Sequence, residues 1–227
     1  WLEKIARGQL EEYEMKQLHD KGINRLTKAP IFIDDTAALN IFELRAKCRR
    51  LKNKHNVGLI IIDYLQLMSG SGDRNANREQ EISRISRDLK GLAKELQIPI
   101  IALSQLSREV EKRKEGNKMP QLSDLRESGA IEQDADMVMF LYRPEYYDIT
   151  ANEFGENNKG ETHVKIAKHR NGSLELIKLK ALLHIQKFIE NDNDGNSQGG
   201  SMPKSGNWKP VSGGSGDDAA KLYINKE

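Results

Sequence analysis

Four consecutive aliphatic residues, Leu59 to Ile62, run directly into Asp63. A run this apolar is typical of a strand that is buried on both faces of a parallel sheet. Ligands bind such sheets at the carboxyl ends of the strands, which is where Asp63 stands. The pattern therefore predicts an α/β fold in which Asp63 lies near a magnesium ion of a nucleotide-hydrolysing site. An aspartate that caps the following helix is the alternative interpretation.

A helix and a second strand follow this run along the chain. Apolar residues at spacings of 3, 4, 3 and 4 predict one buried stripe of a helix that ends before Pro99: Ile82, Ile85, Leu89, Leu92 and Leu96. The stretch from Ile98 to Leu103 predicts a second buried strand, which closes with Ser104 and Gln105. Strand, helix and strand in this order form a right-handed βαβ unit, so we expect the two strands to be parallel.

Weaker patterns predict the remaining elements. A helix is expected from about residue 10 to residue 28, and a short strand at Ile31–Ile33. Asn40, with Glu43 three residues later, predicts the start of another helix. Strands are also expected at 137–142, 162–168, 174–183 and 185–189, the last two as an antiparallel pair.

Composition limits the class of protein without indicating a function. The 227 residues are 37% hydrophobic and 31% charged, which suits one α/β domain of a soluble protein. No apolar run approaches the roughly 18 residues of a membrane span, so no membrane partner is expected. The single cysteine, Cys48, fits a reducing cytoplasm. A net charge of +2 is too small to indicate nucleic-acid binding by itself.

Several polar side chains are candidates for chemistry. If the two βαβ strands lie side by side, Gln105 falls near Asp63, where an amide can sense a γ-phosphate or orient water. Lys168 and Arg170 share one face of a strand, roughly 6–7 Å apart, which suits a triphosphate clamp. Arg126, in the polar segment 122–130, is placed to bind a nucleic-acid phosphate. The structural alternatives stay open: a buried amide bonded to backbone, surface cations beside a hairpin, and an ordinary loop.

One expected motif is absent. A nucleotide hydrolase of this type needs a Gly-x-x-x-x-Gly-Lys-Ser/Thr loop around the phosphates, and the sequence contains no such run. The glycine-containing loop at 69–73 follows the acidic strand and lacks the Lys-Ser/Thr pair. Because the chain begins at Trp1 rather than at methionine, we expect an amino-terminally truncated fragment whose phosphate loop lies upstream.

Four segments taken together resemble the carboxyl-terminal domain of bacterial replicative DNA helicases, the DnaB family. They are Leu59-Ile60-Ile61-Ile62-Asp63-Tyr64-Leu65-Gln66-Leu67-Met68, Ile101-Ala102-Leu103-Ser104-Gln105-Leu106-Ser107-Arg108, Ser123 to Asp136, and Ile166-Ala167-Lys168-His169-Arg170-Asn171-Gly172. The match runs in order from about Gly8 to Ile189. It implies a RecA-like P-loop NTPase core with a mostly parallel sheet, here without its first strand and phosphate loop.

The resemblance also implies roles for particular residues. Asp63 corresponds to the Walker B magnesium residue, and Gln105 to the γ-phosphate-sensing glutamine. Lys168 and Arg170 correspond to the pair that reaches the neighbouring subunit's ATP, with Arg170 as the arginine finger. Arg126, Glu127 and Gly129 match the central-channel loop that tracks single-stranded DNA, and the loop from Ser69 to Arg78 matches a second, variable channel loop. Two positions depart from the family pattern: His169, where glutamine is common, and Ser173, where proline often stands.

The resulting expectation is the motor region of a hexameric replicative helicase that uses ATP to unwind DNA. Residues 1–190 would form the partial RecA-like domain, and 191–227, rich in Asn, Asp, Gly and Ser, a disordered low-complexity tail. The implied cofactors are ATP and Mg²⁺; the implied partners are single-stranded DNA, further copies of the chain, primase and a helicase loader. The fragment is expected to be inactive alone. A non-catalytic RecA-like interaction module and a RecA-like recombinase or clock-type ATPase are the alternatives.

Overall fold

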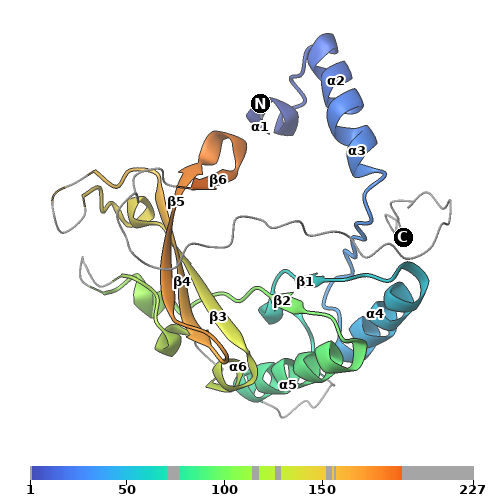
Figure 1. Cartoon of the computed structure of the whole chain (residues 1–227), viewed down its shortest axis with the longest axis vertical. Coiled ribbons are helices and arrows are strands. Elements are labelled where there is room, and N and C mark those ends of the chain that lie inside the picture. The colour runs from blue at the N-terminus through green and yellow to red at the C-terminus, as the bar shows by residue number, and fades with distance from the viewer. Residues whose placement is uncertain are drawn as a thin grey trace. The chain divides into compact units, whose positions relative to one another are not determined.

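The computed structural model describes residues 2–70, 77–113, 118–125, 129–151, 155 and 157–190. The predicted tail, 191–227, lies outside this part of the chain. The chain divides into two compact units, of which the first comprises residues 1–34 and 190–227 and the second residues 35–189, and each is described by itself. Figure 1 shows the elements of both. Over the described residues, none of the helices combines the length and the hydropathy that a membrane span needs.

The first unit contains helices within residues 2–26. It contains α1 (Leu2–Ala6), α2 (Glu12–Leu18), a π-helical stretch (His19–Ile23) and α3 (Asn24–Leu26). The last three follow one another without a break, as expected for the helix predicted at 10–28. The strand predicted at Ile31–Ile33 is wrong: these residues are irregular, and Ile33 is 62% exposed. An apolar run this short forms a strand only when a neighbouring strand pairs with it, and no described strand does.

The second unit begins with α4 (Ile41–His55), which starts as predicted at Asn40. The Oδ1 atom of Asn40 accepts hydrogen bonds from the backbone N–H groups of Phe42 and Glu43, each 3.0 Å long. These bonds satisfy two donors that an uncapped helix would leave without a partner. The helix buries Ile41, Leu44 and Cys48.

Replacing this cap should weaken the fold measurably. We expect Asn40→Ala to lower the free energy of unfolding by about 0.5–2 kcal/mol, because the two N–H groups lose their acceptor. Urea denaturation followed by circular dichroism measures the change. Asn53→Ala, at an exposed position inside the same helix, is the matched control and should not destabilise. Equal losses in the two variants would contradict the assignment of Asn40 as the cap.

A parallel βαβ unit follows, as the sequence predicts. It consists of β1 (Ile60–Ile62), α5 (Arg78–Leu96) and β2 (Ile100–Ala102), and β1 pairs in parallel with β2. The predicted stripe of α5 packs in the main core, together with residues of α4 and of the segment after β1. The buried members of this core are Ile41, Leu44, Cys48, Leu65, Met68, Ile82, Ile85, Leu89, Leu92 and Ile131.

A four-stranded sheet completes the second unit. Its strands are β3 (Met137–Tyr142), β4 (Glu161–His169), β5 (Glu175–Leu182) and β6 (Lys187–Glu190), adjacent in that order. The pairs β3·β4 and β4·β5 are antiparallel. A short helix, α6 (Gly129–Asp134), leads into β3. The antiparallel β3·β4·β5 arrangement brings the end of β4 next to the start of β3, which is where the candidate cations stand.

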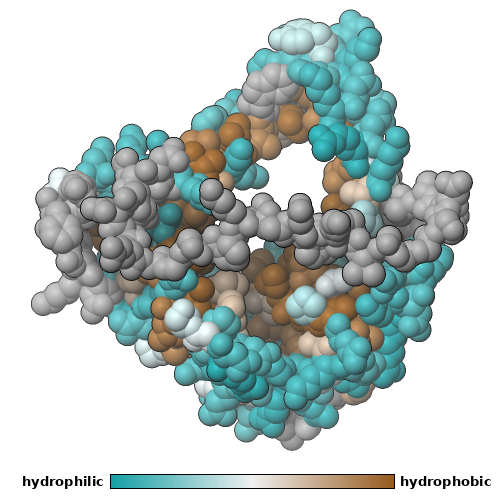
Figure 2. Space-filling view, viewed as in Figure 1, coloured by the Kyte–Doolittle hydropathy of each residue, from teal (hydrophilic) through white to brown (hydrophobic). Residues whose placement is uncertain are grey.

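The apolar run of β1 is covered on one face rather than on both, which corrects the expectation of two-sided burial. Ile60 and Ile62 pack against the main core, whereas Ile61 is 62% exposed. β3 repeats the pattern, with Val138, Phe140 and Tyr142 buried and its other three residues exposed. Figure 2 shows hydrophobic surface over this part of the second unit. Among the described residues nothing covers these exposed positions, so the apolar side chains there stay in contact with solvent.

Candidate functional site

The carboxyl ends of β1 and β2 stay paired beyond the strands themselves. Leu103 N donates to Ile62 O over 2.9 Å, and Leu65 N donates to Leu103 O over 2.9 Å. Asp63 follows β1 and Gln105 lies three residues after β2, so both stand at the same edge of the pair, and both residues are exposed. The two strands therefore lie side by side, which is the condition for the predicted placement of Gln105 near Asp63. The roles of Asp63 and Gln105 stay predictions.

Gln66 links the two strand ends, and sequence reasoning gave it no role. Its Nε2 atom donates to Ser104 Oγ over 2.9 Å and to Gln105 O over 3.3 Å. Its Oε1 atom accepts from Gln105 N over 3.2 Å. The amide thus fixes the backbone of Gln105 relative to the segment that follows Asp63. The only sequence signal was a polar residue between the apolar Leu65 and Leu67.

The donors at this edge suit a magnesium ion that is shared with phosphates. No described group of three or more His, Cys, Asp or Glu side chains forms a complete protein cage for a metal. Mg²⁺ does not need one, because it keeps several waters and binds through one or two carboxylates plus substrate phosphates. The exposed carboxylate of Asp63 fits that manner of binding. A groove of about 460 Å³ runs along the stretch after β2, lined by Gln105, Leu106, Ser107, Arg108, Val110, Glu111 and Tyr147.

Arg78 and Glu81 anchor the base of the predicted variable channel loop. Arg78 Nη2 donates to the carbonyl oxygens of Gln66, over 2.8 Å, and Met68, over 3.3 Å. Glu81 accepts from Arg78 and from the backbone N–H of Gly70. Burial acts to raise the pKa of the Glu81 carboxyl, but the bonds from Gly70 and Arg78 outweigh it and hold the pKa below its ordinary value. The two ends of the loop are therefore tied together, while 71–76 lie outside the described residues.

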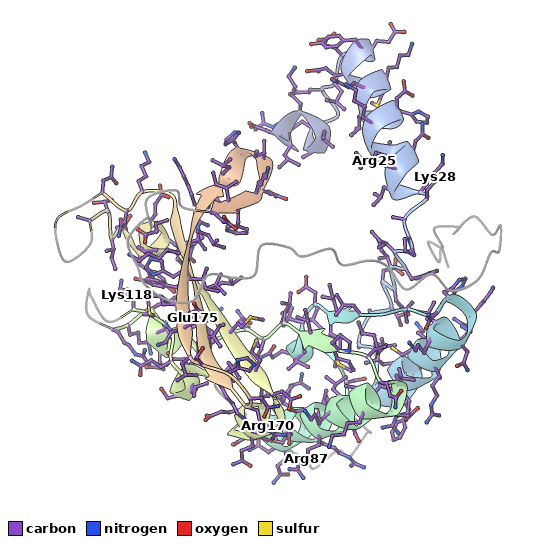
Figure 3. The ribbon with its side chains drawn as sticks, in the orientation of Figure 1. Arg25, Lys28, Arg87, Lys118, Arg170 and Glu175 are labelled. Atoms are coloured by element: carbon purple, nitrogen blue, oxygen red, sulfur yellow. The ribbon has the colours of Figure 1, made fainter. Side chains whose placement is uncertain are left out.

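Lys168 and Arg170 stand at the end of β4, as predicted, and each is bound within the chain. Lys168 Nζ donates to the carbonyl oxygens of Glu132 and Gln133, the latter over 3.3 Å. These carbonyls belong to the last turn of α6, where helices leave acceptors unsatisfied. Arg170 lies one residue beyond β4, and its Nη1 atom is 3.3 Å from Asp136 Oδ1. Lys90 of α5 binds the same carboxylate, and Figure 3 labels Arg170 together with Arg87, which projects from α5.

Asp136 joins three elements at this point, a role that the sequence did not indicate. Its Oδ2 atom accepts from Lys90 Nζ of α5, and its backbone oxygen accepts from Arg170 N over 2.8 Å. The hydrogen bond from Lys90 lowers the pKa of the Asp136 carboxyl, and the charges of Arg170 and Lys94 lower it further. The carboxylate therefore stays ionised between its cations.

The predicted DNA-binding segment is described only at its edges. Arg126 and Glu127 lie outside the described residues, and Gly129 is the first residue of α6. The preceding stretch is held by Asp124, which is 2% exposed and accepts from Arg113. Ser107 N also donates to Asp124 O over 3.0 Å. The approach to the segment is thus attached to the stretch that follows Gln105, an attachment that sequence reasoning missed.

Comparison with known proteins identifies similar sequences. Residues 1–190 match the model of the family described as DnaB-like helicase C terminal domain. Replicative DNA helicase DnaC of Bacillus subtilis is 48% identical over 187 residues, which are 82% of this chain and 39% of that protein. Replicative DNA helicase DnaB of Geobacillus stearothermophilus is 52% identical over 164 residues, which are 72% of this chain and 35% of that protein. The chain therefore spans somewhat more than a third of the length of these relatives.

Solved structures share the fold. One is described as the structure of a DnaB-like replicative helicase and its interactions with primase; it has a TM-score of 0.73 and 39% identity, over 84% of this chain and 44% of that chain. A second, described as an ATPase domain, also has a TM-score of 0.73 and 39% identity, over 84% of this chain and 65% of that chain. These likenesses confirm the predicted RecA-like fold class.

Proposed function

The chain belongs to the family of DnaB-like helicase C-terminal domains, and we propose that it forms part of the ATP-driven motor of a replicative DNA helicase. The observation that carries the proposal is the shared edge of β1 and β2. There Asp63 and Gln105 follow paired parallel strands and are linked through Gln66. A carboxylate and an amide at the carboxyl ends of adjacent strands suit recognition of a magnesium-bound triphosphate.

The cofactors of the proposed motor are ATP and Mg²⁺. Asp63 binds the metal, directly or through its waters, and Gln105 contacts the γ-phosphate. When bound, the metal neutralises charge on the phosphates during transfer. The sequence contains no Gly-x-x-x-x-Gly-Lys-Ser/Thr run, so these 227 residues by themselves should bind ATP weakly and unwind no DNA.

Arg170 and Lys168 act on the ATP of a neighbouring subunit. Both stand at the end of β4, on an element separate from the edge that carries Asp63. Two halves of a site on separate elements suit a homo-hexameric ring, in which each subunit supplies metal-side groups to one interface and cations to the next. A finger supplied in trans makes hydrolysis depend on the position of the neighbour.

Single-stranded DNA is the proposed polymer substrate. Arg126, Glu127 and Gly129 contact its backbone in the central channel, without reading bases. The attachment of Asp124 to the stretch after Gln105 supports a connection between nucleotide state and this segment. Binding through phosphates predicts an affinity that falls as salt is added.

The remaining parts of the proposal concern organisation and partners. Residues 1–190 form the partial motor domain, and 191–227, whose composition predicts a low-complexity tail, lie outside the described residues. Primase and a helicase loader are the proposed protein partners, and the cytoplasm is the proposed compartment. One of the similar solved structures is that of a helicase described together with its interactions with primase, which supports the same partner for this chain.

Strand displacement by the full-length protein tests the proposal. We expect Mg²⁺-dependent ATP hydrolysis that single-stranded DNA stimulates, and 5′-to-3′ unwinding of a forked duplex. A recombinase-type ATPase would hydrolyse ATP without displacing the strand, and a non-catalytic module would do neither. Tight Mg²⁺-dependent ATP binding by these 227 residues alone would contradict the requirement for a Gly-x-x-x-x-Gly-Lys-Ser/Thr phosphate loop.

A further inference from the structure

We propose that Asp136 is a positioning residue that holds and orients Arg170 for its action on the neighbouring subunit. This inference rests on the proposed function, because it assumes that Arg170 serves a nucleotide site in trans. Asp136 lies between α6 and β3, two residues after the helix ends and immediately before the strand begins. It contacts side chains from two further elements, α5 and the turn after β4.

Asp136 holds Arg170 at two points. The backbone N–H of Arg170 donates to the backbone oxygen of Asp136 over 2.8 Å, and Nη1 lies 3.3 Å from Oδ1. β4 ends at His169, so Arg170 already belongs to the turn that leads to β5. A long arginine side chain in a turn samples many rotamers unless a partner restricts it. Contact at both the backbone and the guanidinium limits the directions in which the side chain can leave the turn.

Lys90 in turn holds the carboxylate of Asp136. It binds Oδ2, whereas Arg170 faces Oδ1, so the two cations use different oxygens. Lys90 stands on α5 next to Leu89, a buried member of the main core. The carboxylate is therefore attached to a helix that contributes four buried residues to that core. Arg170 is oriented through Asp136 by a rigid element, although it lies in a turn.

The exposure of these groups points to a role in function. The side chains of Asp136 and Arg170 are 59% and 53% exposed. Exposed ion pairs contribute little to folding, because water and salt screen them. The same exposure leaves the guanidinium accessible to a partner surface. Lys168 is held separately, by hydrogen bonds to two carbonyl oxygens of α6. Both cations are therefore fixed at the same end of the sheet.

A double-mutant cycle in the full-length protein tests the role of Asp136. Asp136→Asn keeps the shape and removes the charge, and we expect kcat for ATP hydrolysis to fall about 10- to 100-fold with KM changed less than about twofold. In the Arg170→Ala background, the same substitution should lower kcat by less than about twofold further. Thermal unfolding of Asp136→Asn should match that of the parent. Asp88→Asn, an acid of α5 that faces Arg45, is the matched control and should retain full activity.

A second variant tests whether Asp136 acts by orienting Arg170 or only through its negative charge. Lys90→Met removes the outer anchor and should lower kcat about 3- to 10-fold, with no further loss when it is combined with Asp136→Asn. Normal kcat in Asp136→Asn, or a full additional loss in the Arg170→Ala background, would overturn the inference while leaving the proposed function intact. Normal hydrolysis by Arg170→Ala itself would instead show that the proposed role of Arg170 fails, and the inference with it.

Discussion

Arg170→Ala should lower ATP hydrolysis by the assembled full-length protein by about a thousandfold or more, the usual effect of removing an arginine finger. In the role that we propose, the guanidinium stabilises negative charge that develops on the transferred phosphoryl group, and a lysine cannot supply the same fork of donors. Nucleotide binding and assembly should persist, because Arg170 is exposed and its ion pair contributes little to folding. Steady-state ATP hydrolysis measures the loss of rate. Fluorescent-nucleotide binding and sedimentation of the same variant show whether nucleotide binding and assembly persist.

Arg87→Ala is the matched control for this variant. Arg87 is an exposed arginine of α5, three residues before Lys90, and is labelled in Figure 3. Its removal changes the local charge by the same amount, so hydrolysis should change less than about twofold. Equal losses in both variants would mean that general charge at this surface is important, and that Arg170 has no particular role.

Asp63→Ala should have the second largest effect, lowering hydrolysis by about a hundredfold or more. Removing the carboxylate takes away the protein ligand that we propose for Mg²⁺ and leaves the metal held by phosphates and water. Raising the Mg²⁺ concentration should therefore restore part of the rate. A titration of hydrolysis against Mg²⁺, with Asp63→Ala compared with the parent, measures the shift.

Glu79→Gln provides the control for Asp63→Ala. Glu79 is an exposed acid in the first turn of α5, and we give it no role at the site. Its removal should leave the Mg²⁺ dependence unchanged. If Asp63→Ala hydrolyses ATP normally at low Mg²⁺, the proposed metal site is wrong. The helix-capping alternative does not hold either, because Tyr64 is the N-cap of the helix that follows and no side chain caps it.

The sequence predicted the parts of the fold that depend on local pattern. Spacings of 3 and 4 along α5 and the apolar runs of β1 and β2 identify a βαβ unit, and parallel pairing follows from its connectivity. The same reasoning failed where burial depends on what packs against a strand. Ile61 is as apolar as its neighbours yet exposed, and Ile31–Ile33 is irregular and belongs to neither described sheet.

The candidate site was predictable to the same extent. Asp63 and Gln105 could be assigned to one edge because parallel strands end together. The contacts of Gln66 with Ser104 and of Lys90 with Asp136 join residues 38 and 46 positions apart, and no local pattern signals them. The sequence also gives no signal of the contact between Asp124 and Arg113, because both are residue types that are common in loops. Such contacts follow only from the way the elements pack.

The central claim is that Asp63 and Arg170 serve the same ATP from different subunits, and mixing two inactive variants tests it directly. In a ring assembled from equal amounts of Asp63→Ala and Arg170→Ala chains, about a quarter of the interfaces pair an intact Asp63 with an intact Arg170. We predict that the mixture hydrolyses ATP at a substantial fraction of the parent rate, although each variant alone is nearly inactive. A mixture no more active than its components, with co-assembly verified, would contradict the claim.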